Sequence, residues 1–355
     1  SISLIYVKNA QIDLYKFVLE KKTTVLAPGV NYLSWRDYLI NRPIWLHAVE
    51  ITKNSGYEVR PLLGKISTID KGKLSVISET TGALAVINAS YFDSSKWVIG
   101  NLKLGNEWAA AEIQARTALV IDQQKNAKII PQVAYQGKVV AGGNSRSFTG
   151  INRERIDNDL ILYTSSFGTN TGTNQYGTEV RLKDGRVVEV SSDGNMSLEE
   201  STEVLSGHGP SAEFLQKLKK GTRVYLQHDL SNKIVEDAKY IVGAGPLLVE
   251  SGKVKVMAVE EDFANDIKNG RAPRTAIGIK ADGSLILVVV DGRSSYSGGV
   301  TLTELAEYLL KLGAVSAMNF DGGGSSEMVI KNKIVNTPSD GVERPIRVAL
   351  GVLKS

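Results

Sequence analysis

The chain has 355 residues, of which 42% are hydrophobic and 23% charged, so it can bury a sizeable core and shows no composition typical of disorder. Its formal charge of +4 is spread along the chain without a basic block, which argues against a nucleic-acid partner. The absence of cysteine excludes disulfides, thiolate metal sites and cysteine nucleophiles.

Short runs rich in Val, Ile, Leu and Tyr are bounded by Gly, Asn, Asp and Ser along the whole chain, with a few capped helices between them. This pattern predicts a strand-rich α+β fold of mixed sheets with several short helices. Residues 1–27 have the pattern of a separate strand pair, 3–7 and 12–19, that ends at the Pro28-Gly29 breaker. We expect residues 1–27 to be an N-terminal appendage and residues 28–355 to form one large domain.

Capping boxes and C-terminal glycines predict four helices. They are expected at residues 71–81, after Ser197, at 212–220 and at 302–312. The last one has the clearest pattern, because Thr301 and Glu304 form a capping box, leucines recur on one face, and Gly313 follows the end. Its leucine stripe is typical of a helix that packs on a core.

Two predicted strands, 83–88 and 314–321, are apolar until a polar residue appears at the tip. Such a tip suits an active-site group, because the strand holds it rigidly. The longest apolar runs, such as 285–290, have the length of a strand and are too short to span a bilayer. We therefore predict no membrane insertion.

The strongest motif covers residues 319–326, where Asp321 is followed by three glycines and two serines: Gly322, Gly323, Gly324, Ser325 and Ser326. Backbone without side chains can approach a ligand closely, and successive N–H groups in such a turn can bind an anion. The alternative is an ordinary tight turn, which needs fewer glycines. The motif is not a nucleotide P-loop, because no lysine follows the glycines and the next residues have the pattern of a strand.

A second polar cluster, Asp291, Gly292 and Arg293, follows the predicted strand 285–290. Here a plain Asp-Gly turn is as good an explanation as a functional site. Arg274 and Arg344 each lie beside a predicted strand or turn, and a guanidinium fork is a natural partner for phosphate. A surface salt bridge is the alternative for both.

The histidines, His47, His208 and His228, have no metal-ligand spacing, so we predict neither a metal site nor a cofactor. His208 lies in a glycine-rich turn, where a solvated loop residue is the alternative to an acid or base. No G-x-S-x-G sequence occurs, which removes the commonest serine-hydrolase motif.

These segments together resemble the phosphodiester glycosidase family. The resemblance runs from about residue 28 to 352 and rests on the order and spacing of its motifs, at residues 87–92, 243–248, 274–278, 290–293, 319–326 and 336–345. Ala89-Ser90 departs from the pattern, where we expect glycines, and this difference predicts a narrower pocket.

The resemblance implies a hydrolase that releases a sugar, with N-acetylglucosamine as one candidate, from a sugar-1-phosphodiester. A departing phosphate monoester is a stable anion, so no strong acid is needed and charge stabilisation can suffice. Asp321 is the expected catalytic carboxylate and Asp291 the second candidate, each as nucleophile, base or electrostatic stabiliser. Substrate or phosphate contacts are expected from Asn88, Arg274, Arg293, Arg344 and residues 322–326.

Two other functions stay open on the sequence. A metal-dependent phosphodiesterase would cut P–O with Asp291 and Asp321 on a cation, and a silent glycan-binding protein of the cell envelope would bind without turnover. We expect a glycan or sugar-phosphodiester partner and no nucleic acid. We also expect a secreted or cell-surface protein whose signal peptide or anchor lies outside this sequence.

Overall fold

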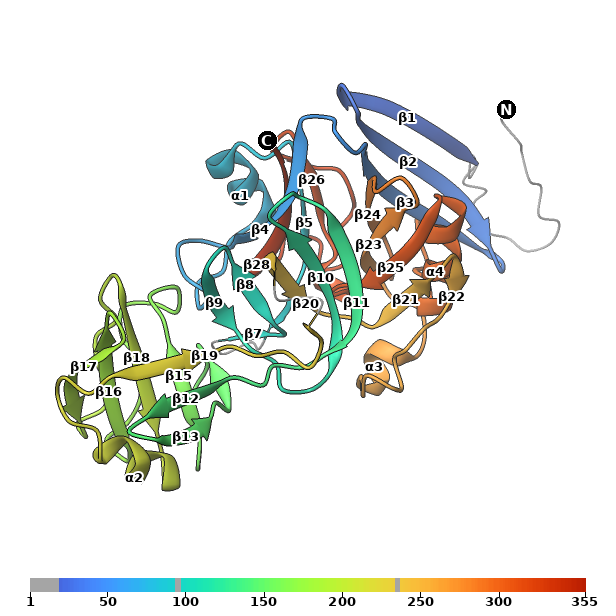
Figure 1. Cartoon of the computed structure of the whole chain (residues 1–355). Helices are drawn as coiled ribbons and strands as arrows, with labels where there is room; N and C mark the ends of the chain where they lie inside the picture. The colour runs from blue at the N-terminus through green and yellow to red at the C-terminus, as the bar shows by residue number, and fades with distance from the viewer. Residues whose placement is uncertain (1–18, 93–96, 234–236) are drawn as a thin grey trace.

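The computed structural model describes residues 19–92, 97–233 and 237–355. These residues form 28 strands and four short α-helices (Figure 1). The strand-rich prediction is confirmed, but α+β is too balanced a description, because the fold is largely β. Mixed sheets were also expected, yet the pairings within the described sheets are antiparallel except for one short parallel pair.

The largest sheet has eight strands and carries one helix on its outer face. In spatial order its strands are β1 (Glu20–Ala27), β2 (Val30–Leu39), β3 (Arg42–Ile51), β24 (Leu285–Val290), β23 (Arg274–Lys280), β25 (Ala314–Asn319), β21 (Leu247–Glu250) and β22 (Lys253–Val254). The helix is α4 (Leu302–Lys311), and its predicted capping box of Thr301 and Glu304 is present. Its leucines pack against the strands, as the sequence predicted.

A five-stranded sheet lies on the other side of the central core. Its strands are β27 (Lys333–Ile334), β26 (Met328–Ile330), β5 (Ala85–Asn88), β28 (Val348–Lys354) and β4 (Tyr57–Leu63). Helix α1 (Leu74–Thr81) covers its outer face, close to the predicted helix 71–81, and Gly82 ends it in the left-handed conformation. β5 and β25, the strands with polar tips, therefore belong to different sheets that share one core.

A third sheet links this body to an outer lobe. Its strands are β11 (Ala127–Val133), β10 (Arg116–Asp122), β20 (Ala238–Gly243), β8 (Leu102–Leu104) and β9 (Glu107–Ala110). The two-stranded pair of β6 (Tyr91–Phe92) and β7 (Val98–Ile99) comes just before β8 in the chain, and helix α3 (Asn265–Lys268) lies between β22 and β23.

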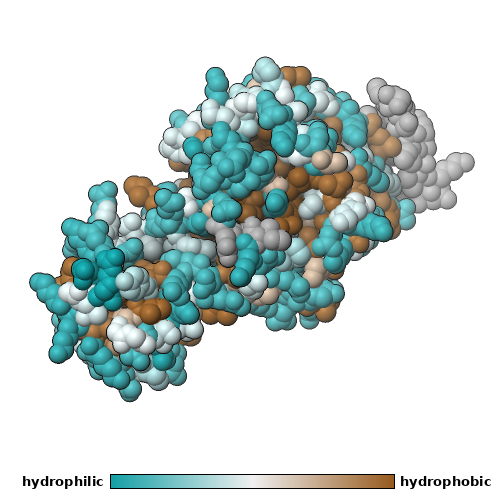
Figure 2. All heavy atoms as spheres, viewed as in Figure 1, coloured by the Kyte–Doolittle hydropathy of each residue, from teal (hydrophilic) through white to brown (hydrophobic). Residues whose placement is uncertain are grey.

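We call residues 138–227 the outer lobe, which projects from the body at the lower left of Figure 1. It comprises β12 (Lys138–Ala141), β13 (Asn144–Ser147), β14 (Gly150–Ile151), β15 (Leu160–Tyr163), β16 (Thr178–Lys183), β17 (Arg186–Ser191), β18 (Thr202–Gly207), α2 (Pro210–Gln216) and β19 (Val224–Gln227). One buried cluster, with members such as Trp108, Val120 and Leu205, runs from the third sheet into this lobe. On the face viewed in Figure 2, hydrophilic residues cover most of the outer lobe and apolar residues gather in the middle of the body.

Two helix predictions need correction. The segment after Ser197 forms no helix, because Ser197 accepts a bond from Arg181 and lies in a bridge to Asn170. The helix expected at 212–220 is α2, which begins earlier, at Pro210, because proline is favourable in the first helical turn, and ends earlier, at Gln216.

Part of the predicted appendage can be located. Residues 20–27 form β1, which pairs along its length with β2 of the largest sheet, and most of the expected strand pair lies outside the described residues. The division into 1–27 and 28–355 stays a prediction. In the described ranges no helix combines the length and the hydropathy needed to cross a membrane.

Candidate active site

The tips of β5 and β25 meet at Asp321. The Asp321 N–H donates to the Ala89 carbonyl at 2.9 Å, and the Asn88 amide donates to the Asp321 carbonyl at 2.6 Å. The two polar strand tips, 233 residues apart in sequence, are thus joined directly.

The glycine loop, residues 322–324, uses part of its backbone internally. The Gly322 N–H donates to Asp321 Oδ1 at 2.9 Å, and the Gly323 N–H donates to the Pro273 carbonyl at 2.9 Å. Gly323 has φ +61°, which favours glycine, and it opens a 3-10 turn over Gly323–Ser325. The Gly324 N–H takes part in none of the turn's bonds, so the predicted anion-binding backbone is narrower than the run of glycines indicates.

Two guanidinium groups lie against these glycines. A Cβ placed on Gly323 would lie 3.3 Å from Arg293 Nη2, and one placed on Gly324 would lie 2.0 Å from Arg344 Nη2. Arg293 is exposed, has φ +59°, and forms no ion pair with any described residue. Arg344 pairs with Asp340 at 2.7 Å. The Asp340 carboxylate lies there too, because its Oδ1 would be 2.5 Å from the same Cβ on Gly324. The loop is therefore flanked by two guanidinium groups, of which Arg293 is unpaired among the described residues and Arg344 is paired, and glycine is what lets them approach.

Asp321 is half-buried beside these charges. Burial raises the pKa of its carboxyl to about 6, although the Ser325 hydroxyl, the Gly322 N–H and Arg344 act in the opposite direction. Burial and the nearby Asp321 charge also raise the pKa of Tyr91, whose hydroxyl donates to the Gly245 carbonyl. A carboxyl whose pKa is raised toward neutrality by burial, beside an arginine side chain, is a common feature of active sites.

The sequence predicted that the Arg274 guanidinium is free to bind phosphate, but in the structure all three of its nitrogens donate to backbone carbonyls. Its Nε, Nη1 and Nη2 donate to the carbonyls of Val300, Ile267 and Gly270, each at 3.1 Å. It is buried, and this burial lowers its pKa. Arg274 therefore ties neighbouring segments together, and its contact with phosphate stays a prediction.

Asn88 and Ser326 form hydrogen bonds that hold the two ends of the glycine loop. Asn88 Oδ1 accepts from the Thr275 hydroxyl at 2.7 Å and from the Glu327 N–H at 3.2 Å. Ser326 is buried, and its hydroxyl lies 3.1 Å from that of Thr275. The Asn88 oxygen is used in these two bonds, and its Nδ2 donates to the Asp321 carbonyl. The predicted contact of Asn88 with substrate therefore also stays a prediction.

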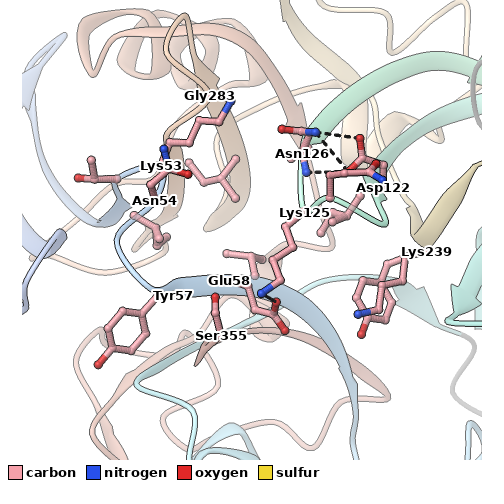
Figure 3. A pocket seen from close by; sticks show the side chains of 18 of the residues that line it. Lys53, Asn54, Tyr57, Glu58, Asp122, Lys125, Asn126, Lys239, Gly283 and Ser355 are labelled. Atoms are coloured by element: carbon pink, nitrogen blue, oxygen red, sulfur yellow. Dashed lines mark hydrogen bonds and ion pairs between the residues drawn. The ribbon is translucent and has the colours of Figure 1, made fainter.

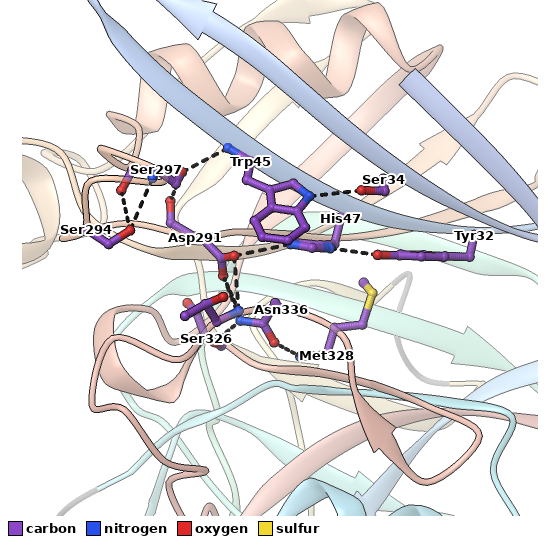
Figure 4. A network of polar contacts seen from close by, with 11 residues as sticks. Tyr32, Ser34, Trp45, His47, Asp291, Ser294, Ser297, Ser326, Met328 and Asn336 are labelled. Atoms are coloured by element: carbon purple, nitrogen blue, oxygen red, sulfur yellow. Dashed lines mark hydrogen bonds and ion pairs between the residues drawn. The ribbon is translucent and has the colours of Figure 1, made fainter. Parts of the chain in front are cut away.

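Asp291 lies in a buried polar network (Figure 4). Its oxygens accept from the Asn336 amide at 2.9 Å, from the Thr337 N–H at 3.1 Å, and from His47 Nε2 at 3.2 Å. His47 Nδ1 in turn accepts from the Tyr32 hydroxyl at 2.8 Å. Asp291 thus has a bonded partner on each oxygen and no exposed face, unlike Asp321.

Sequence reasoning missed His47 and Glu327. His47 lies in the middle of β3, where an alternating strand pattern gives no sign of a partner 244 residues away. Glu327 follows the double serine and was taken as the start of a strand, but it is fully buried, and burial raises its pKa to about 8. The signal available in the sequence was a carboxylate directly before the apolar strand residues 328–330.

A surface cleft lies away from these residues. About 410 Å³ opens between the turns around Asn54, Lys125 and Gly283, where Lys125 pairs with Glu58 at 3.0 Å (Figure 3). None of the predicted site residues lines it. Within the described ranges no group of three or more acidic or histidine side chains is placed to hold a metal ion.

Comparison with known proteins places the chain in a family. Residues 176–353, half of the chain, match the phosphodiester glycosidase family. Human N-acetylglucosamine-1-phosphodiester alpha-N-acetylglucosaminidase is 45% identical over 67 residues, which is 19% of this chain and 13% of that protein. The matched stretch is therefore a small part of that relative.

Three solved structures share the fold. A hypothetical protein from Synechocystis matches 94% of this chain and 63% of its own with a TM-score of 0.83 at 21% identity. A candidate exported protein of Burkholderia pseudomallei matches 88% and 74% with a TM-score of 0.76 at 24% identity. The zebrafish N-acetylglucosamine-1-phosphodiester alpha-N-acetylglucosaminidase catalytic domain, auto-inhibited by its pro-peptide, matches 94% and 87% with a TM-score of 0.53 at 14% identity. With its family match and its motif at the meeting point of two sheets, the chain belongs to the phosphodiester glycosidase family.

Proposed function

We propose that this protein hydrolyses a sugar-1-phosphodiester to free sugar and a phosphate monoester. One observation carries the proposal: the half-buried carboxyl of Asp321, with a pKa near 6, lies at a glycine loop flanked by Arg293 and Arg344. The family supports action on a phosphodiester, and the human relative's name supports N-acetylglucosamine as the first sugar to test.

The phosphate would bind over the glycine loop. Arg293 and Arg344 offer charge, and the Gly324 N–H offers a backbone donor, so negative charge that develops on the departing phosphate is stabilised where it forms. In the reaction the anomeric C–O bond breaks, its electron pair leaves with the phosphate, and the oxygen of a water molecule becomes the new anomeric oxygen. One water proton ends on the sugar side and the other is released.

Asp321 would act at the anomeric carbon as an ionised carboxylate, either as base for water or as nucleophile. Asp291, the second candidate, would act as a positioning residue, because its bonds to Asn336 and Thr337 hold the segment that leads to Arg344. Arg274 and Asn88 would likewise hold the loop in place.

Product analysis in ¹⁸O-water tests this function. The substrates are aryl phosphodiesters of N-acetylglucosamine-1-phosphate and of glucose-1-phosphate, and mass spectrometry identifies the products. We expect ¹⁸O in the free sugar and none in the phosphate monoester. Sugar-1-phosphate as product, with activity lost in chelator, would instead establish the metal-dependent phosphodiesterase. Binding without any turnover would establish the glycan-binding function.

We also propose that the protein acts outside the cytoplasm. The fold shared with the candidate exported protein of Burkholderia pseudomallei supports this location. Fractionation of the native host, with detection by antibody, is the corresponding test, and a signal confined to the cytoplasm contradicts it.

A further inference from the structure

Glu327 lies between the glycine loop and the segment that carries Arg344. Its Oε1 accepts the backbone N–H of Arg344, and its own N–H donates to Asn88 Oδ1. The side chain has no exposed surface, and its Oε2 has no hydrogen-bond partner among the described residues. A buried carboxyl oxygen without a partner is costly when ionised, so this arrangement calls for an explanation.

The surrounding charges do not compensate an ionised Glu327. The charged groups that act on it are Arg344, Glu343 and Asp340. The Arg344 guanidinium already pairs with Asp340, through Nε at 2.7 Å, and Glu343 adds a second negative charge while it binds Ser75. One cation therefore faces three carboxyl groups, which favours the neutral acid at Glu327.

We propose that Glu327 is a positioning residue: as a neutral carboxylic acid it fixes the backbone of Arg344 and so holds the Arg344 guanidinium against Gly324. This inference rests on the proposed function, in which that guanidinium binds the phosphate. The pKa of Glu327, raised to about 8 by burial, keeps the acid protonated at neutral pH. Ionisation above this pH strengthens the bond from the Arg344 N–H, but it also adds a negative charge beside Asp340 and Glu343 and leaves the charged Oε2 without a partner among the described residues. We expect this repulsion and the cost of the buried charge to shift the segment that carries Arg344.

Two substitutions separate this role from a merely structural one. Glu327→Gln keeps an acceptor for the Arg344 N–H and cannot ionise, whereas Glu327→Leu removes the acceptor. Sulfate is the binding probe, because it keeps its two charges across this pH range. We expect Glu327→Leu to lower both sulfate affinity and kcat/KM by about tenfold, as for loss of a bond that orients a charged group.

Glu327→Gln should stay within about twofold of the wild type at pH 7, since an isosteric amide keeps the acceptor. Wild-type activity and sulfate affinity should fall above pH 8, and this alkaline loss should be absent in Glu327→Gln. Glu307→Gln, on the exposed face of α4, is the matched control and should behave as wild type. An alkaline loss unchanged in Glu327→Gln, or equal damage from both substitutions at pH 7, would overturn the proposal.

A readout without substrate keeps this test separate from the proposed function. The Arg344 Nε–H signal in NMR, assigned by its absence in Arg344→Lys, should shift above pH 8 in the wild type and not in Glu327→Gln. If the wild type shows no turnover and no sulfate binding but the signal shifts in this way, the proposed function fails and the role of Glu327 stands. A signal that does not respond to pH, or responds equally in both proteins, refutes the role.

Discussion

Two buried acidic environments in this molecule contrast with each other. Asp159 of the outer lobe receives both ends of the Arg153 guanidinium, at 2.7 and 2.9 Å, and the Ile156 N–H at 2.8 Å. Burial alone acts to raise its pKa, but these bonds outweigh burial and lower it. Asp321 and Glu327 at the glycine loop have fewer donors, and their pKa values are raised to about 6 and about 8.

The contrast shows how the fold distributes hydrogen-bond donors. A carboxylate that accepts a bidentate arginine is fixed and ionised, which suits the stability of a small lobe. A carboxyl left short of donors can exchange a proton near neutral pH, which suits a catalytic site at a cost in stability. In the first case the arginine is bound to the acid; at the glycine loop Arg293 is exposed to solvent.

The largest expected effect distinguishes Asp321 from Asp159. Asp321→Asn should lower turnover by at least about a hundredfold while the protein stays folded, because the catalytic carboxylate is lost. Circular dichroism and steady-state kinetics on the same preparation check both parts. A folded variant that keeps more than a tenth of the activity would show that Asp321 is not the catalytic group.

Asp159→Asn is the counterpart and should have the opposite profile. It leaves the Arg153 guanidinium without its carboxylate, with only the Glu154 and Thr149 carbonyls as charge-free acceptors, so the free energy of unfolding should fall by about 3 kcal/mol, while kcat per folded molecule is unchanged. Urea unfolding measures this loss. A drop in kcat at full folding would mean that the outer lobe takes part in catalysis.

The next effect concerns the two arginines at the loop. Arg293→Ala and Arg344→Ala should each lower kcat/KM on the phosphodiester by about tenfold to a hundredfold, the value of a charge-assisted bond of about 1.5 to 3 kcal/mol. An aryl glycoside without phosphate is the control substrate and should be affected much less. Equal losses on both substrates would assign the arginines to the sugar subsite instead.

A smaller effect is expected in the pH profile. If Asp321 acts as an ionised carboxylate, kcat/KM should fall below about pH 6, the pKa to which burial raises it. With the alkaline loss from Glu327, the profile should be bell-shaped, with its maximum between about pH 6 and pH 8. Activity that rises as the pH falls below 6 would make Asp321 a general acid.

The smallest effect is in stability as a function of pH. Asp321 binds its proton more tightly folded than unfolded, so it lowers stability as pH rises from its unfolded pKa of 3.8 toward 6. Asp159 has the opposite sign, with stability present above 3.8 and lost as pH falls through its lower folded pKa. As the pH rises from about 4 to 7, the Tm of Asp321→Asn should rise relative to wild type. The Tm of Asp159→Asn should fall relative to wild type as the pH rises toward about 4, and the difference should then stay constant. Parallel curves would mean that neither pKa shift exists.

Part of the fold followed directly from local sequence. The capping box at Thr301 and Glu304, with leucines at helical spacing, predicted α4 nearly to the residue. The helix predicted after Ser197 was wrong, because the Ser197 hydroxyl instead accepts a hydrogen bond from Arg181, which lies on β16. A capping motif is recognised from residues close together in sequence. In the folded protein its hydroxyl can instead bond to a side chain from another strand, and then no helix forms.

The sequence by itself determined the glycine loop, the carboxylate before it and the apolar strand that ends there, because each depends on residues a few positions apart. Only the tertiary structure decided which carboxyl groups are saturated and which arginines are open. His47 meets Asp291 across 244 positions and Asn88 meets Asp321 across 233, and no local pattern encodes such pairs. The pKa values of Asp321 and Glu327 were also decided by the tertiary structure. They depend on burial and on the number of hydrogen-bond donors around each carboxyl group, and these surroundings exist only after the sheets have packed.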